Sequence, residues 1–182
     1  MRRPSRLVLE TQRHLKWRSL DHLEAVTMVL CGLCLAGFST SVFLDVLTRT
    51  LAAPWLWLQE VTSTFFVYGI FIGAAAATRR NDHLYLSAIT ETMSGMPRLA
   101  IETFNRLVVL AVALCMVWFG YINFRQGFGS FRMPSMTPIA SLYAAIPISG
   151  VLIALFTVEQ LVNGWRHGFE SAEPAHEEIH IL

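Results

Sequence analysis

The sequence predicts an all-α, polytopic membrane protein with four transmembrane helices. Of the 182 residues, 54% are hydrophobic and only 15% are charged, with a mean hydropathy of +0.48, whereas a soluble domain carries roughly 25% charged residues. The charges leave four gaps of 18 or more residues without Asp, Glu, Lys or Arg, at 25–44, 61–78, 107–124 and 133–158. About 20 helical residues cross a bilayer core. A soluble bundle is disfavoured, because its helices would keep a polar face.

The distribution of basic residues predicts the orientation of the chain. Residues 1–20 form a basic leader, and the first apolar run exceeds the length of a cleaved signal peptide, so we expect an uncleaved first helix. Eleven basic residues fall on one side of the spans and three, Arg49, Arg125 and Arg132, on the other. Basic loops stay cytoplasmic, so both termini are expected inside, with the leader acting as a juxtamembrane anchor and no role in nucleic-acid binding.

The membrane domain is expected to cover residues 21–166, with spans at about 23–47, 57–80, 98–124 and 138–163. Between spans two and three, Leu86, Ile89, Met93 and Met96 share one helical face, which predicts an interfacial helix on the inner side. Pro147 is expected to kink span four. Residues 167–182, with four glutamates, are expected to form an acidic, flexible cytoplasmic tail.

Small residues recur at every fourth position in two of the spans, a spacing that lets a second helix approach closely. The six helix-packing candidates are Gly32, Ala36 and Thr40 in span one, and Gly69, Gly73 and Ala77 in span two. Two interpretations stay open for the span-two stripe: packing within this chain, or a seat for a helix of a partner.

The middles of all four spans lack ionisable groups, and this absence bears most directly on function. Four acidic residues lie near the span ends, where we expect water to reach them: Glu24, Asp45, Glu60 and Glu159. We also expect water to reach Glu102 and Arg106 at the inner end of span three. Charged groups at mid-membrane depth are costly and mark ion or proton pathways. Their absence argues against a proton relay or a self-contained ion-coupled carrier.

A group of charged residues gathers at the outer rim: Asp45, Arg49, Glu60, Arg125 and Arg132. Asp45 and Arg49 are four residues apart and can pair on one helix face. One interpretation is an interfacial salt bridge that pins the loop between spans one and two. The other is a polar surface that docks a partner on the outer face.

Other chemistries find little support. Cys31 and Cys34 have the spacing of a redox pair, but they and Cys115 lie within spans, where a thiol packs as a small hydrophobe. The six histidines lie outside the spans, so no haem or metal site is expected, and His176 and His180 alone are a weak metal signal. We expect no cofactor and no enzyme activity. The alternatives are an independent small four-span carrier or a membrane redox protein acting on quinone or thiols.

Four motifs in order carry a family resemblance: LDVLTR (44–49), WLQE (57–60), FIGAAAATRRNDH (71–83) and MPSMTPIASLYAAIPISGVLIAL (133–155). With them the chain resembles, over about 23–164, the DctQ-like small membrane subunit of tripartite ATP-independent periplasmic (TRAP) transporters. One departure is Ser87, where the family often has an acid.

The resemblance implies a scaffold subunit of a sodium-coupled symporter in the bacterial inner membrane. It implies a large integral membrane permease subunit that holds the substrate and sodium sites, and a periplasmic substrate-binding protein that delivers an organic acid. A chain without mid-membrane charges suits that division of labour.

Overall fold

The computed structural model describes residues 16–17, 20–80 and 96–167, and it is almost entirely helical, which confirms the predicted fold class. Four elements are long helices: α1 (Asp21–Thr50), α2 (Leu58–Arg80), α4 (Met96–Gln126) and α6 (Ala145–His167). The short elements are η3 (Gly127–Gly129), β1 (Phe131–Arg132), β2 (Thr137–Pro138) and α5 (Ala140–Tyr143). By length and composition, α1, α2, α4 with η3, and α5 with α6 could each cross a membrane.

Some expected elements fall outside the described residues. The interfacial helix expected at 84–96 lies there except for Met96, which begins α4 instead. The tail expected at 167–182 lies there too, except for His167, the last residue of α6.

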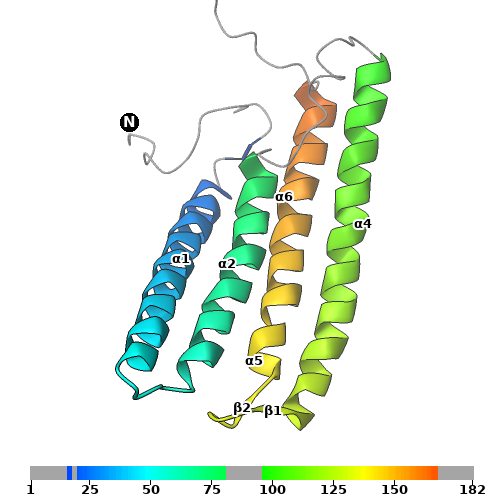
Figure 1. The fold of residues 1–182 in the computed structure, drawn as a ribbon. Helices are drawn as coiled ribbons and strands as arrows, with labels where there is room; N and C mark the ends of the chain where they lie inside the picture. Colours follow the sequence, from blue (N-terminus) through cyan, green and yellow to red (C-terminus); the bar gives the residue numbers. More distant parts are fainter. Residues whose placement is uncertain (1–15, 18–19, 81–95, 168–182) are drawn as a thin grey trace, which may run out of the picture.

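The four long helices stand side by side in a row whose spatial order differs from the order of the chain. Helix α1 packs on α2, α2 packs on α6, and α6 packs on α4 (Figure 1). Helices α1 and α4 are therefore the edges of the row. Because each helix has only one or two neighbours, most of its surface is left for lipid or for another protein.

The most buried side chains of α1 are polar, the reverse of a helix in a soluble bundle. The buried residues of α1 are Glu24, Thr27, Ser41 and Thr48. In the second turn of α2, Thr62 Oγ1 donates a hydrogen bond to Ser41 Oγ on α1 at 3.0 Å. Exposed apolar side chains such as Leu33, Leu35 and Phe43 cover the rest of α1. This polarity suits a helix in hydrocarbon, where polar groups find partners only on other helices.

Small residues bring the helices of each seam close together. A Cβ at Gly37 of α1 would lie 2.7 Å from the ring of Phe65 on α2. A Cβ at Gly120 of α4 would lie 2.9 Å from Pro147 Cδ on α6. Both positions therefore require the absence of a side chain, and the row is held by contact at these points.

Local backbone chemistry explains where the helices end. Helix α1 ends in a Schellman turn: the amides of Ala52 and Ala53 donate to the carbonyls of Arg49 and Thr48, with Ala52 at φ 57°. The fourth span is interrupted at Ala144, between α5 and α6. Pro147 lies three residues further on and has no N–H for the Tyr143 carbonyl, so the interruption lies where the proline removes a helical hydrogen bond.

A short antiparallel hairpin follows α4 and η3, at the same ends of the helices as the start of α2. Strand β1 pairs with β2 through Phe131–Pro138 and Arg132–Thr137. The Met136 amide donates to the Arg132 carbonyl at 2.8 Å, and the Ile139 amide donates to the Ser130 carbonyl at 2.9 Å. The hairpin thus returns the chain from α4 to α5 beside the first turn of α2 (Figure 1).

Candidate functional site

Two polar networks hold the two ends of α2. The hairpin latch joins the first turns of α2 to the β1–β2 hairpin through Glu60, Ser63, Thr64, Arg132 and Ser135. The Arg79 hub joins the last turn of α2 to α1, α6 and the residues ahead of α1. These two ends are called the hairpin end and the Arg79 end.

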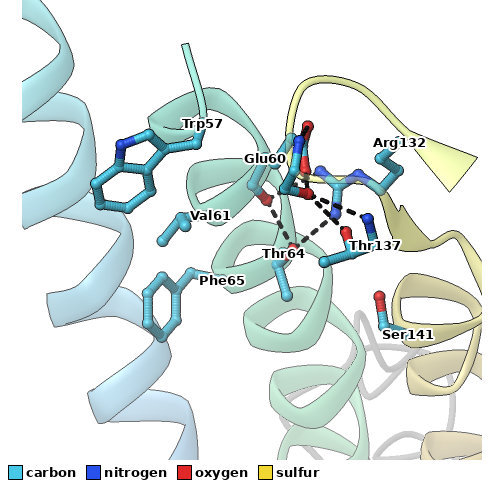
Figure 2. A pocket seen from close by; sticks show the side chains of 9 residues that line it. Trp57, Glu60, Val61, Thr64, Phe65, Arg132, Thr137 and Ser141 are labelled. Atoms are coloured by element: carbon cyan, nitrogen blue, oxygen red, sulfur yellow. Dashed lines mark hydrogen bonds between the residues drawn. The ribbon is translucent and has the colours of Figure 1, made fainter. Parts of the chain in front are cut away.

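In the hairpin latch, the hairpin supplies the hydrogen-bond donors and α2 supplies the acceptors. The Ser135 amide and hydroxyl both donate to the Glu60 carboxylate, the amide at 3.2 Å. The Arg132 guanidinium donates to the Glu60 carbonyl at 2.9 Å, to Ser63 Oγ at 2.6 Å and to Thr64 Oγ1 at 2.9 Å. Figure 2 shows Arg132 reaching from the hairpin toward Thr64. These hydrogen bonds hold the hairpin against α2.

A cleft of about 290 Å³ lies beside the latch. Trp57, Val61 and Phe65 form its apolar wall on the α1 side, and Glu60 and Thr64 point toward the hairpin (Figure 2). The polar groups on the cleft are already partnered within the latch.

The other outer-rim candidates lie apart from the latch. Asp45 and Arg49 form an ion pair on α1, with Arg49 Nε 3.0 Å from Asp45 Oδ2. Glu60 does not join this pair, because its carboxylate turns to Ser135. Arg125 is exposed at the end of α4, the far edge of the row. The structure therefore brings Glu60 and Arg132 together and leaves the Asp45–Arg49 pair and Arg125 at separate places on the rim.

The Arg79 hub is the deepest polar network in the described part of the chain. The Arg79 side chain is fully buried, and so are those of Glu24 and Glu159. Its guanidinium makes a two-pronged contact with Glu159, Nε to Oε2 and Nη2 to Oε1, both at 3.1 Å. It also donates to Glu24 Oε2 at 2.8 Å and to Asp21 Oδ1 at 3.1 Å. All three guanidinium nitrogens therefore have partners.

Among the described residues, the hub contains bases and acids in equal number. The bases are Lys16, Arg79 and Arg80, and the acids are Asp21, Glu24 and Glu159. Burial lowers the pKa of Lys16, which feels the carboxylates of Glu24 and Glu159. The Arg79 guanidinium also lies 5.4 Å from the centre of the Phe156 ring, a favourable cation–π distance.

The hub overturns one expectation from the sequence. Glu24 and Glu159 were expected to be reached by water, but both are fully buried. Glu102 and Arg106 were expected in water as well, and they are only 4% and 5% exposed. The physical reason is pairing: Arg79 pairs with Glu24 and Glu159, Arg80 also pairs with Glu24, and Glu102 accepts a hydrogen bond from Arg106 one turn away. Paired and hydrogen-bonded charges can be buried at far lower cost than single ones.

A signal for the buried face was present in the sequence. Thr27, Cys34, Ser41 and Thr48 recur every seven residues along α1, with Glu24 one turn before the first. A heptad of polar and small residues in an apolar span marks the face that meets a neighbouring helix. The partners of that face, such as Arg79, are distant in sequence and leave no such pattern.

The two small-residue stripes have different surroundings. Gly69 and Gly73 face α1 within the chain, their built Cβ positions 3.4 Å from Cys34 Cβ and 3.3 Å from Cys31 Sγ. Gly32, Ala36 and Thr40 are exposed, and a Cβ at Gly32 would meet nothing within 4 Å. The span-two stripe is therefore occupied by this chain, and the span-one stripe is open. Ala77 is half-buried near the Arg79 end.

The charged residues of the described helices stand toward the helix ends. No Asp, Glu, Lys or Arg occurs between Glu24 and Asp45, between Glu60 and Arg79, between Arg106 and Arg125, or from Ala140 to Val158. Among the residues that the structure describes, no group of three or more His, Cys, Asp or Glu could hold a metal ion. The three cysteines are free thiols.

Comparison with known families gives a match over most of the chain. Residues 38–167 match the family model described as the DctQ component of tripartite ATP-independent periplasmic transporters. The match begins within α1 and ends at the last residue of α6, so it includes the hairpin latch, Arg79 and Glu159.

Three curated proteins are similar to the chain. It is 26% identical over 114 residues to the sialic acid TRAP transporter permease protein SiaT of Haemophilus influenzae (strain 86-028NP), covering 61% of this chain and 18% of that protein. It is 23% identical over 148 residues to a protein of another H. influenzae strain described as a TRAP transporter small permease, covering 80% and 92%. It is 22% identical over 130 residues to the sialic acid TRAP transporter small permease protein SiaQ of Vibrio cholerae, covering 68% and 75%.

Proposed function

Because the chain belongs to the DctQ component family of TRAP transporters, we propose that it is a non-catalytic scaffold within a three-part uptake system. It is a multi-pass small permease subunit of the bacterial inner membrane. In this role it braces a large integral membrane permease subunit and helps a periplasmic substrate-binding protein to dock. The process served is sodium-coupled symport of an organic acid, and both termini lie in the cytoplasm.

The observation that carries this proposal is the absence of charge from the middles of the described helices. Ion coupling needs polar or ionisable groups along the path of the ion. The charged groups of this chain that lie deepest, Arg79, Glu24 and Glu159, are engaged with one another at one end of the row. The coupling chemistry is therefore assigned to the large subunit.

The relatives support the same assembly. The chain spans only 18% of the length of the SiaT permease protein that it matches, so that relative has a large region beyond the match. Two of the relatives are named for sialic acid, which is itself an organic acid. The flat row of helices has wide faces free for a large partner (Figure 1).

The proposal is tested by reconstituting uptake in liposomes with and without this chain. With the large subunit and the binding protein present, omission of the chain should abolish sodium-driven uptake. Undiminished uptake without it would refute the scaffold role, as would solute transport by the chain alone.

The exposed stripe of α1 is the part of the scaffold proposed to meet the large subunit. Gly32→Leu places a bulky side chain where, apart from the nearby backbone of α1 itself, no atom of the described residues lies within 4 Å of the added Cβ. The variant should fold normally but co-purify less of the large subunit, because backbones can no longer approach closely. Normal co-purification would count against this face. Gly73→Leu is a poorer test, because Gly73 packs against Cys31 in the same chain.

The rim at the hairpin end is the part proposed to dock the binding protein. The Arg49 side chain is 48% exposed. The substitution Arg49→Glu reverses the charge at this position. Uptake at subsaturating binding protein should fall and recover when more binding protein is added. If the dependence on binding protein does not change, the Asp45–Arg49 pair serves only to order the end of α1.

A further inference from the structure

The residues ahead of α1 enter the Arg79 hub through their main chain. Arg79 Nη2 donates to the Trp17 carbonyl at 3.1 Å, and Nη1 donates to the Leu20 carbonyl at 2.7 Å. The Trp17 amide donates to Glu159 Oε1 at 2.5 Å. The amide and the carbonyl of Trp17 are both engaged, so its main chain is fixed against the buried side chains of the hub.

These contacts cross the row of helices. In the row, α2 separates α1 from α6 (Figure 1). Trp17 lies ahead of α1, yet its indole Nε1 donates to Asn163 Oδ1 on α6 at 2.7 Å. Trp17 therefore contacts both Arg79 at the end of α2 and Asn163 on α6, and so links α6 to the residues ahead of α1.

Lys16 adds a third base to the described part of the hub. Among the described residues, Arg79 and Arg80 pair with the three acids Asp21, Glu24 and Glu159. Lys16 is only 7% exposed and interacts electrostatically with Glu24, Glu159 and both arginines. Burial of a carboxylate is strongly unfavourable without a compensating charge, so the positive charge of Lys16 favours the buried state of Glu24 and Glu159.

We infer that Lys16 and Trp17 form a strap that closes the Arg79 hub, and that opening the strap admits water to the hub while the hairpin end stays shut. The strap supplies one cation, one amide donor and one indole donor, and it ties the first helix to the last. This inference does not depend on the proposed transport function.

The test is hydrogen exchange measured by mass spectrometry on the full-length chain in lipid nanodiscs. Trp17→Ala should raise the exchange rate of residues 76–80 and 159–163 about tenfold, because opening becomes local and frequent. Residues 130–139 of the hairpin end should be unaffected. Trp165→Ala is the matched control, since Trp165 is 64% exposed on α6 two residues beyond Asn163, and it should leave both ends unchanged.

Two milder variants keep the test decisive if Trp17→Ala fails to fold. Trp17→Phe removes the indole donor but keeps the ring and the main chain, and should raise exchange at 159–163 several-fold. Lys16→Gln should do the same at 76–80, whereas Lys16→Arg should not, because it keeps the charge. Unchanged hydrogen exchange in Trp17→Phe and Lys16→Gln would overturn the inference. An equal rise at both ends would also overturn it, since that result means global loosening instead of a local closure.

Discussion

The two ends of α2 are held by arginines with very different surroundings. At the Arg79 end the guanidinium is fully buried and meets three carboxylates and two carbonyls. At the hairpin end the Arg132 guanidinium is half-buried and meets two hydroxyls and one carbonyl. Arg79 thus pairs mainly with charged carboxylates away from water, whereas Arg132 donates to neutral acceptors beside water.

The difference teaches that the surroundings of a contact, and not only the number of contacts, decide its contribution to stability. A hydrogen bond beside water replaces one that water would have made, so its net effect is about 1 kcal/mol. A buried charge that loses its partner is not solvated by water, so the loss is strongly destabilising. The Arg79 end should therefore govern the stability of the row, and the hairpin end should govern the shape of its rim.

The largest effect is expected for Arg79→Ala, which leaves Glu24 and Glu159 buried without their shared partner. The free energy of unfolding should fall by about 3–5 kcal/mol, as measured by denaturant titration in mixed micelles. The free energy of unfolding of Arg79→Lys should lie between those of Arg79→Ala and the natural protein. Lysine keeps the positive charge, but its ammonium cannot reproduce the two-pronged contact with Glu159. A loss below about 1 kcal/mol for Arg79→Ala would break the contrast between the ends.

A smaller effect is expected for Arg132→Ala, the same substitution at the opposite end of α2. It removes the donors to Ser63, Thr64 and the Glu60 carbonyl. The free energy of unfolding should fall by no more than about 1.5 kcal/mol. Limited proteolysis should nevertheless cut faster between residues 130 and 139. A loss as large as that of Arg79→Ala would show that the hairpin latch governs the stability of the whole row.

The smallest effect is expected for Arg49→Gln, which removes the exposed ion pair with Asp45. The free energy of unfolding should change by less than about 0.5 kcal/mol, because exposed pairs are screened by water and salt. Repeating the measurement at high salt should give the same value for both proteins. A larger loss would mean that Asp45 is held more tightly than its exposure indicates.

What the sequence could predict followed from local information. The four spans came from the spacing of charges, which is set by bilayer thickness. The Asp45–Arg49 pair came from a separation of four residues, which places both on one helix face.

What the sequence could not predict depends on distant contacts. Arg79 and Glu159 are separated by 80 positions, and no spacing rule joins them. The expectation that Glu24 and Glu159 meet water was wrong because it considered each carboxylate without its partner. The hairpin has strands of two residues each, too short for any periodic signal, so its latch to Glu60 left no trace in the pattern.

The separation between Arg79 and Glu159 also has a consequence for synthesis of the chain. The ribosome completes α2 well before it reaches α6, and 80 residues of translation separate the two partners. At about 5–20 residues per second, the delay is about 4–16 s. During that interval Gln160, whose amide meets the Thr78 and Arg79 carbonyls, is missing as well. Until α6 is made, Arg79 can pair with Asp21 and Glu24 of α1, but it lacks the two-pronged partner Glu159. The Arg79 hub can therefore be completed only after the fourth span has been synthesised.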